Sequence, residues 1–556
     1  MSIESIESVA QWLIKKTSDP DFVRRLGGIL YDVCAIPTVP GNDVEQNAEQ
    51  ENTVFNLLEK AIREAGLPGL VERRPIAERI SEHSRYTLPY YTTSASPYKG
   101  RSNLLHVYRP DSTKITPSFG VAFNAHIDTV APHIPPREVG TTLFGRGSSD
   151  DKGCCVAIVG ALSLLESLRI EKSITPKGNV VSMFVIEEET GGNGSLSLVL
   201  DDEVSALYET VVVAESTEDQ IHPANRGAVW YKVELGAETP ENTLLALKIV
   251  KALEKAGQEL RSERSHPLFP AKPVQTCHGI LGAFGEHPSG ICGEIEFKII
   301  KKDLRISGSD EKLYHQIEKS LEKGLQKYLA EYGQRMPEGA HHYKLCSDDD
   351  GYRVTFLGTT GHMGSSYEND NAITTAAFLI PEVMQDIPGL EVILAKPCNG
   401  SFALEGGQGF MPCHAIEEIK EKMSAAVNAA LENEFITAYK EHARTANSTT
   451  GEIPKITFDK LHNDAFACDP DSPQVRMALE AARLVGMPVD LPLRGFKASC
   501  DARLFAHLRP EKTVITAGPG TIRVAHSDDE SIDLKELARS AAFYALYALY
   551  ATGALQ

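Results

Sequence analysis

The chain carries the stretch Gly145-Arg-Gly-Ser-Ser-Asp150-Asp-Lys-Gly153 directly before a helical pattern that runs from Lys152 to Leu168. The glycines on either side of Asp150 indicate a turn, and the helix is expected to begin where that turn ends. An acidic side chain between a strand and a helix lies at the edge of a sheet where α/β proteins bind their ligands. Asp150 is therefore the first candidate ligand.

Three apolar runs typical of strands also end in side chains that can bind a metal ion. They end in Asn124-Ala-His126-Ile-Asp128, in Glu187-Glu188-Glu189-Thr-Gly-Gly, and in Val211-Val-Val-Ala-Glu215. Ligands gathered at strand ends predict a metal site at one edge of an α/β sheet.

The order of strands and helices predicts the fold class. Up to about residue 230, and again after Asp469-Pro470, strands alternate with helices, which indicates a doubly wound, mostly parallel α/β sheet. The nearly continuous apolar run 179–186 is typical of a strand covered on both faces.

Between these parts the pattern becomes strand, helix, strand, strand, helix, strand, and it occurs twice. This order predicts an inserted α+β domain of two ferredoxin-like βαββαβ units, at 231–350 and 351–464. The sheet domain is expected to consist of residues 1–230 and 465–556.

Composition limits the class of protein. A chain of 556 residues is too long for one core, and a hydrophobic content of 42% is ordinary for a globular protein. The net charge of −20 argues against nucleic acid or an anionic membrane as partner. We see no signal peptide and no apolar run long enough to cross a bilayer. The ten cysteines are scattered, so we expect reduced thiols and a cytoplasmic location.

Two of the motifs have a chemical interpretation of their own. His126 and Asp128 share one face of a strand, so Asp128 can accept a hydrogen bond from the ring nitrogen that faces away from a metal. Taken alone, however, the pair fits a histidine in an ordinary turn better. Three consecutive glutamates, 187–189, repel one another unless a cation is near. Nitrogen and carboxylate ligands suit zinc, with manganese or cobalt as alternatives.

Taken in order, the motifs resemble those of a family of co-catalytic, two-metal metallopeptidases. That family includes aminoacylase, carboxypeptidase G, succinyl-diaminopimelate desuccinylase and the bacterial dipeptidases. The motifs are Ala125-His126-Ile-Asp128-Thr-Val130, Gly145–Gly153, Glu187-Glu188-Glu189-Thr-Gly191, Ala214-Glu215-Ser-Thr217, Gly358-Thr-Thr-Gly-His362, Asn371-Ala-Ile373, Gly518-Pro-Gly520 and Ala525-His526.

The resemblance implies a set of metal ligands. Asp150 corresponds to the ligand that bridges two divalent ions. His126 and Glu215 would bind one ion, and Glu189 and His526 the other. The family also has a cis peptide bond after its bridging aspartate, so Asp150-Asp151 is expected to be cis.

The resemblance implies catalytic residues as well. Glu188 corresponds to the general base, Asp128 orients the imidazole of His126, and His362 of the inserted lid domain stabilises the oxyanion. The family usually has aspartate where this chain has Glu187, so Glu187 and Glu188 remain an alternative pair of base and ligand. The spacing to the following glycines favours Glu188 and Glu189.

The motifs identify the residues that bind substrate less clearly than the metal ligands. Arg503 is a candidate for binding a substrate carboxylate, because arginine binds carboxylates with two hydrogen bonds, and a structural role is the equal alternative. The implied activity is hydrolysis of amide or peptide bonds in small substrates, as in a dipeptidase or carboxypeptidase. The alternative is an N-acyl-amino-acid deacylase, since Glu215 resembles that branch whereas the doubled lid resembles the dipeptidases. A non-catalytic binding relative would have lost a ligand or the base.

The lid pattern bears on assembly. Its first copy passes from strand to helix through Leu235-Gly-Ala-Glu-Thr-Pro240 without a histidine, whereas the second carries His362. Family members with a single lid unit commonly form dimers in which each subunit supplies its lid histidine to the partner's site. The second copy in this chain would replace that partner lid, so a monomer is expected to be active.

Overall fold

The computed structural model describes residues 5–110, 120–301, 310–337, 339–348, 351–365, 369–398, 400–432, 454–458 and 462–555. The chain forms two compact units. The first consists of residues 1–227, 266–271 and 463–556, and the second of residues 228–265 and 272–462. The short segment 266–271 belongs to the first unit, where Leu268 accepts a backbone hydrogen bond from Gly495 at 2.7 Å.

A six-stranded sheet forms the centre of the first unit. Its strands, from edge to edge, are β1 (Leu70–Pro75), β2 (Ser102–Tyr108), β6 (Val180–Val185), β3 (Val121–His126), β7 (Thr210–Val213) and β19 (Thr513–Thr516). The last four are parallel to one another, β2 is antiparallel to β6, and β1 is antiparallel to β2. The predicted mostly parallel sheet is confirmed, and every residue of β6 is buried, as the apolar run predicted.

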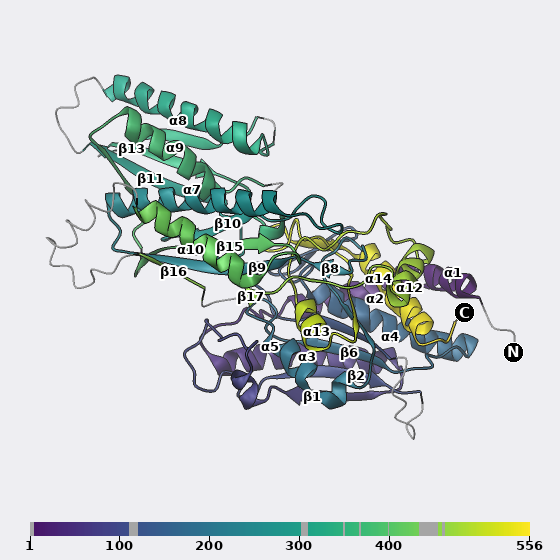
Figure 1. The fold of residues 1–556 in the computed structure, drawn as a ribbon. Coiled ribbons are helices and arrows are strands. Elements are labelled where there is room, and N and C mark those ends of the chain that lie inside the picture. Colours follow the sequence, from purple (N-terminus) through teal and green to yellow (C-terminus); the bar gives the residue numbers. More distant parts are fainter. Residues whose placement is uncertain are drawn as a thin grey trace. The chain divides into compact units, whose positions relative to one another are not determined.

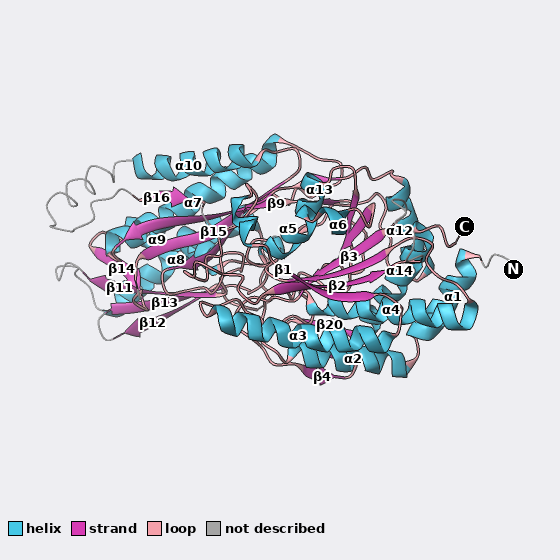
Figure 2. Cartoon of the chain, turned by 90° about the horizontal axis from the view of Figure 1, so that it is seen from below, coloured by secondary structure: helices cyan, strands magenta, loops and turns pink. Residues whose placement is uncertain are grey.

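Helices lie on both faces of this sheet. They are α1 (Ile6–Thr17), α2 (Pro20–Cys34), α3 (Val44–Ala65), α4 (Lys152–Lys172), α5 (Asn193–Leu200), α6 (Asp202–Ser205), α12 (Pro473–Leu484), α13 (Ala502–Leu508) and α14 (Leu534–Ala551). Figure 2 shows α2, α3, α4 and α14 on one side of the strands, and α5 and α13 on the other. Helix α2 begins at Pro20, and the side chain of Asp19 caps it.

Short elements complete the first unit: η1 (Glu78–Glu82), β4 (Arg137–Val139), β5 (Thr142–Phe144), β8 (Ala224–Asn225), β18 (Phe466–Ala467) and β20 (Ser531–Asp533). Among the described helices, α4 alone is long and apolar enough, by length and composition, to cross a membrane. The expectation that no run is long enough was therefore too strict. Most of α4 is buried against α14, α3 and α2, as in a core helix.

The second unit contains two βαββαβ arrangements (Figure 1). The first comprises β9 (Gly227–Gly236), α7 (Pro240–Glu263), β10 (Thr276–Leu281), β15 (Phe402–Phe410), α10 (Ile416–Glu432) and β16 (Lys455–Thr457), and β17 (His462–Asn463) also pairs with β9. The second comprises β11 (Glu294–Lys301), α8 (Asp310–Tyr332), β12 (Tyr343–Asp348), β13 (Gly351–Leu357), α9 (Ala372–Asp386) and β14 (Leu390–Leu394), with η2 (Met363–Ser365) before α9.

The two arrangements are nested, not consecutive. Their sheets have the orders β10-β15-β9-β16 and β12-β13-β11-β14, so each has the ferredoxin-like order, and the second is inserted between β10 and β15 of the first. The expected division at residues 350 and 351 is wrong, because it cuts the β12–β13 hairpin, in which Asp348 pairs with Gly351. Tandem and nested copies produce the same linear order of elements, and only strand pairing distinguishes them.

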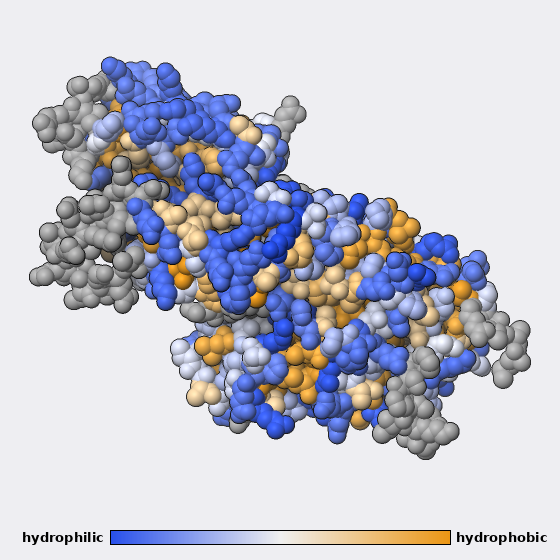
Figure 3. Space-filling view, viewed as in Figure 1, coloured by the Kyte–Doolittle hydropathy of each residue, from blue (hydrophilic) through white to orange (hydrophobic). Residues whose placement is uncertain are grey.

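Helix α8 illustrates how sequence pattern becomes packing. Its buried residues recur at helical spacing, and its remaining surface is rich in Glu and Lys, which makes the outer side of α8 hydrophilic in Figure 3. Gly324 lies on the buried side, where a Cβ would come within 2.7 Å of the Leu379 Cα on α9. The glycine therefore permits the close approach of α8 and α9.

Candidate metal centre

The predicted ligands follow strands of the parallel sheet in the first unit. His126 is the last residue of β3, the glutamates 187–189 follow β6, Glu215 follows β7, and His526 lies in the loop after β19. Because these strands are parallel, their carboxyl ends meet at one edge of the sheet. Asp150 comes to the same edge in the turn before α4.

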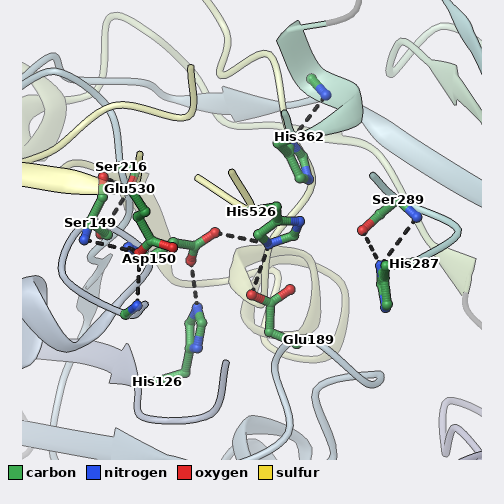
Figure 4. Close-up of polar contacts among 12 residues, drawn as sticks. His126, Ser149, Asp150, Glu189, Ser216, His287, Ser289, His362, His526 and Glu530 are labelled. Carbon is green, nitrogen blue, oxygen red and sulfur yellow. Dashed lines mark hydrogen bonds and ion pairs between the residues drawn. The ribbon is translucent and has the colours of Figure 1, made fainter. Parts of the chain in front are cut away.

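These side chains form two groups that share Asp150. One contains His126, Asp150 and Glu215, the other Asp150, Glu189 and His526, and within each group the ligand atoms lie within 4.8 Å of one another. His126 Nε2 lies 3.1 Å from Asp150 Oδ1, and His526 Nε2 lies 3.3 Å from Asp150 Oδ2. Figure 4 shows the Asp150 carboxylate between the two imidazoles, one oxygen toward each. The peptide bond Asp150-Asp151 is cis, as predicted.

Asp128 contacts both the histidine and the glutamate run. His126 Nδ1 lies 3.5 Å from Asp128 Oδ1 and 3.0 Å from the Asp128 carbonyl oxygen. The same carboxylate accepts hydrogen bonds from the backbone N–H groups of Glu188 at 3.1 Å and Glu189 at 3.0 Å. The Asp128 carboxylate therefore lies against the imidazole and also holds the turn that carries the acids.

The electrostatics of the cluster fit a divalent cation. Burial alone would lower the pKa of His126, but hydrogen bonds with Asp128 and Asp150 raise it well above its ordinary value. Burial would raise the pKa of Asp150, but hydrogen bonds with His126 and His526 hold it well below its ordinary value. Burial and repulsion from Asp150 raise the pKa of Glu215 well above the ordinary value.

Neighbouring carboxylates of this kind repel one another unless protons or cations lie between them. The donors in both groups are imidazole nitrogens and carboxylate oxygens, a set that zinc, manganese and cobalt accept. The residues present therefore fit two divalent ions, with Asp150 offering one oxygen to each.

Glu187 lies outside this cluster. Its carboxylate accepts hydrogen bonds from Arg101 Nη1 at 2.6 Å, from Tyr98 at 2.8 Å and from Tyr91. Arg101 also donates to Glu51, and the side chains of all three charged residues are buried. The network favours Glu188 and Glu189 over the alternative pair. Sequence reasoning missed Arg101 because no local motif marks it.

Glu530 is a second residue that the sequence did not indicate. Its Oε1 accepts backbone hydrogen bonds from Gly147 at 2.8 Å, Asp150 at 3.1 Å and Ser149 at 3.2 Å, and Figure 4 shows Glu530 beside Ser149 and Asp150. Arg146 Nη1 donates to Oε2 at 2.5 Å. The Glu530 side chain is fully buried. One carboxylate therefore fixes the turn that presents Asp150.

Arg503 is buried, with 2% of its surface exposed. Its guanidinium donates to the backbone carbonyls of Gly191 at 2.9 Å and Cys500 at 3.0 Å, and to Asp501 at 3.3 Å. These contacts tie α13 to the glycine turn after the glutamates. They favour the structural alternative over recognition of a substrate carboxylate.

His362 belongs to the second unit, in the loop between β13 and α9. Its backbone forms a bridge with Gly290, and its Nδ1 accepts a hydrogen bond from the Gly364 N–H at 3.0 Å. This acceptor role at Nδ1 leaves the proton on Nε2, the tautomer that an oxyanion donor needs.

Comparison with curated proteins finds relatives over short segments. A probable carboxypeptidase of Emericella nidulans is 30% identical over 157 residues, which is 25% of this chain and 35% of that protein. A peptidase M20 domain-containing protein of Schizosaccharomyces pombe is 30% identical over 108 residues, which is 19% of this chain and 25% of that protein. The matches thus cover about a third or less of these two relatives' lengths.

Solved structures share the fold over the whole chain. The dipeptidase Dug1p of Saccharomyces cerevisiae has a TM-score of 0.56 at 14% identity, over 100% of this chain and 99% of its own. Human carnosine dipeptidase 1 has a TM-score of 0.53 at 13% identity, over 99% and 100%. Identity this low demonstrates the fold alone.

A match to a protein-family model shows which family the chain belongs to. The model of peptidase family M20/M25/M40 matches residues 122–550, which include every predicted metal ligand and the whole second unit. The two ligand groups that share Asp150 agree with the two divalent ions that the motifs implied. As the ordered motifs predicted, the chain belongs to peptidase family M20/M25/M40, a family of metallopeptidases.

Proposed function

We propose that this chain hydrolyses the peptide bond of small peptides, as a dipeptidase or a carboxypeptidase does. The observation that carries the proposal is the sharing of Asp150 between two groups of three ligands. Two divalent ions bound there, zinc first with manganese or cobalt as alternatives, would lower the pKa of a water molecule and polarise a carbonyl group.

The side chains then have separate tasks. His126 and Glu215 would hold one ion and Glu189 and His526 the other, with Asp150 belonging to both groups. Asp128 and Glu530 would keep these ligands in place, because each accepts backbone hydrogen bonds from a turn that carries ligands.

Glu188 is the proposed general base. Among the described residues, no side chain donates a hydrogen bond to the Glu188 carboxylate. Burial and the nearby Asp501 raise the pKa of Glu188 well above the ordinary value. It takes a proton from the attacking water and returns it to the leaving amine. His362 donates a hydrogen bond to the oxyanion, with the second unit acting as the lid.

The doubled βαββαβ arrangement supports a monomer as the active form, since both copies belong to one chain. None of the ten cysteines, all within the described residues, forms a disulfide, which supports a reducing compartment such as the cytoplasm. Small peptides are the proposed substrates. The acidic net charge speaks against nucleic acid as partner.

An N-acyl-amino-acid deacylase remains the second candidate, because Glu215, in place of an aspartate, resembles the deacylase branch. The deciding experiment offers the purified metal-loaded chain a panel of dipeptides, N-blocked peptides and N-acetyl amino acids. Dipeptide hydrolysis supports a dipeptidase, release of a C-terminal residue from blocked peptides supports a carboxypeptidase, and cleavage of acetyl amino acids alone supports the deacylase. Absence of all three, with both metals bound, would refute the proposal.

A further inference from the structure

The second unit contains a cavity of about 310 Å³ that the proposed reaction does not use. Its lining residues come mainly from α7, α8 and the start of β10. Its lining includes Glu254, Arg261, Gln275, Glu331, Tyr332 and Arg335. This volume lies at the lower end of small-molecule sites, which run from about 300 to 1,000 Å³, and suits a ligand of amino-acid size.

The lining of the cavity contains both negatively and positively charged side chains. Glu254 and Glu331 supply two carboxylates, and Arg261 and Arg335 supply two guanidinium groups. Glu254 already accepts hydrogen bonds from Tyr332 at 2.9 Å and Thr374 at 3.1 Å. The balance of charge favours a ligand that is itself neutral overall but carries both charges.

Gln275 adds a specific acceptor. Its side-chain amide donates through Nε2 to the carbonyl oxygens of Met363 at 3.0 Å and Gly364 at 3.4 Å. Two carbonyl partners fix which end of the amide is nitrogen. Its Oε1 is buried and has no hydrogen-bond partner among the described residues, so this acceptor needs a donor from a ligand or a water.

We propose that this cavity binds a free α-amino acid. The ammonium group donates to Gln275 Oε1, and the carboxylate pairs with Arg261 and Arg335, since guanidinium groups bind carboxylates with directed, charge-assisted hydrogen bonds. A free amino acid is also the product that hydrolysis of a dipeptide releases, so this assignment of a regulatory ligand rests on the proposed function.

The same glutamine connects the cavity to His362. Gln275 holds the carbonyl groups of residues 363 and 364, and the Gly364 N–H donates to His362 Nδ1 at 3.0 Å. Two successive hydrogen-bonded contacts therefore connect the Gln275 side chain, whose Oε1 has no partner among the described residues, with the imidazole of His362. An amino acid that occupies the cavity stiffens this loop and slows turnover, because lid loops must move in each catalytic cycle.

The binding test uses isothermal titration calorimetry on the metal-loaded chain. Glycine, L-leucine, L-glutamate and L-lysine are titrated separately, followed by the amide and the deaminated acid of each amino acid that binds. We expect binding of at least one amino acid, weaker binding of both analogues, and a loss of about tenfold or more in affinity in Arg261→Gln/Arg335→Gln. Arg24→Gln, which alters an exposed arginine on α2, is the matched control.

Two outcomes overturn the inference. One is the absence of binding by any of the four amino acids. The other is binding that the double arginine variant retains but that changes in Glu188→Gln, which would locate the ligand at the metal centre.

The coupling test measures dipeptide hydrolysis with and without the amino acid. We expect kcat to fall by about fivefold in the wild type and to stay constant in the double arginine variant. A rise in KM alone, equal in both proteins, would show ordinary product inhibition and refute the coupling. If the chain hydrolyses no peptide at all, the proposed function fails, and the calorimetry alone judges the cavity.

Discussion

Arg101 Nη1 donates a hydrogen bond to Glu187 Oε1 at 2.6 Å, and both side chains are buried. A buried carboxylate held by arginine and by two tyrosines is stabilised where it is and is not free to move toward a metal ion. The contact therefore favours the register in which Glu187 is neither base nor ligand. It supports the proposal that Glu188 transfers the proton and Glu189 binds metal.

Glu188→Gln should retain both metal ions and lose kcat by about a hundredfold or more, because it removes a proton carrier and no ligand. Glu189→Gln should lose metal as well as activity. Elemental analysis beside kcat separates the two, and Glu187→Gln, which alters the network with Arg101, is the neighbouring control. Metal loss in Glu188→Gln would show that the register is shifted by one residue.

Glu530→Gln should weaken metal binding by about 10- to 100-fold, the usual effect of losing a residue that orients a ligand. The substitution removes the charge that accepts from Arg146 and from three N–H groups in the turn that carries Asp150. Titration with a competing chelator measures the affinity. Glu480→Gln, on the surface of α12, should leave it unchanged; an unchanged affinity in Glu530→Gln would mean that the turn is fixed without this carboxylate.

His106 should make the protein less stable in mild acid. Burial lowers the pKa of His106 from 6.5 to about 4, so the unfolded state takes up the proton first as pH falls. Stability is thus lost from about pH 6.5 down to about pH 4 and does not change further below. The loss from this one group amounts to about 3 kcal/mol of unfolding free energy at pH 4.

Chemical denaturation at several pH values measures this effect. His106→Leu should show a smaller loss of unfolding free energy between pH 7 and pH 4 than the wild type. His315→Leu, at an exposed position on α8, should follow the wild-type curve. Parallel curves for wild type and His106→Leu would contradict the prediction.

The last prediction concerns assembly. If His362 serves the metal centre of its own chain, mixing inactive His362→Ala protein with inactive Glu188→Gln protein should restore no activity. In a dimer that exchanges lid histidines, the mixture would regain part of the activity, because one of its two sites would have both groups. Size-exclusion chromatography of the active wild type should show a monomer, and a regained activity would refute the single-chain arrangement.

The sequence by itself determined the candidate ligands and the order of elements. Strand and helix periodicity is local, so the runs that end at His126, Glu189 and Glu215 could be identified as strands before a metal site. The alternation of elements then predicted the parallel sheet, because short βαβ connections permit few other topologies. Family membership followed from the ordered motifs.

Only the tertiary structure decided which partners the buried polar groups have. Arg101 reaches Glu187 across 86 positions of sequence, and Arg146 reaches Glu530 across 384. It likewise decided that the two βαββαβ arrangements are nested, through the pairing of β10 with β15. A buried charged group pairs with the oppositely charged group that lies next to it after the chain has packed. The edge of a strand likewise forms hydrogen bonds with the strand that lies beside it in the folded chain. Neither choice is encoded in local periodicity, so the positions of Glu187, Glu530 and Arg503 had to come from the folded chain.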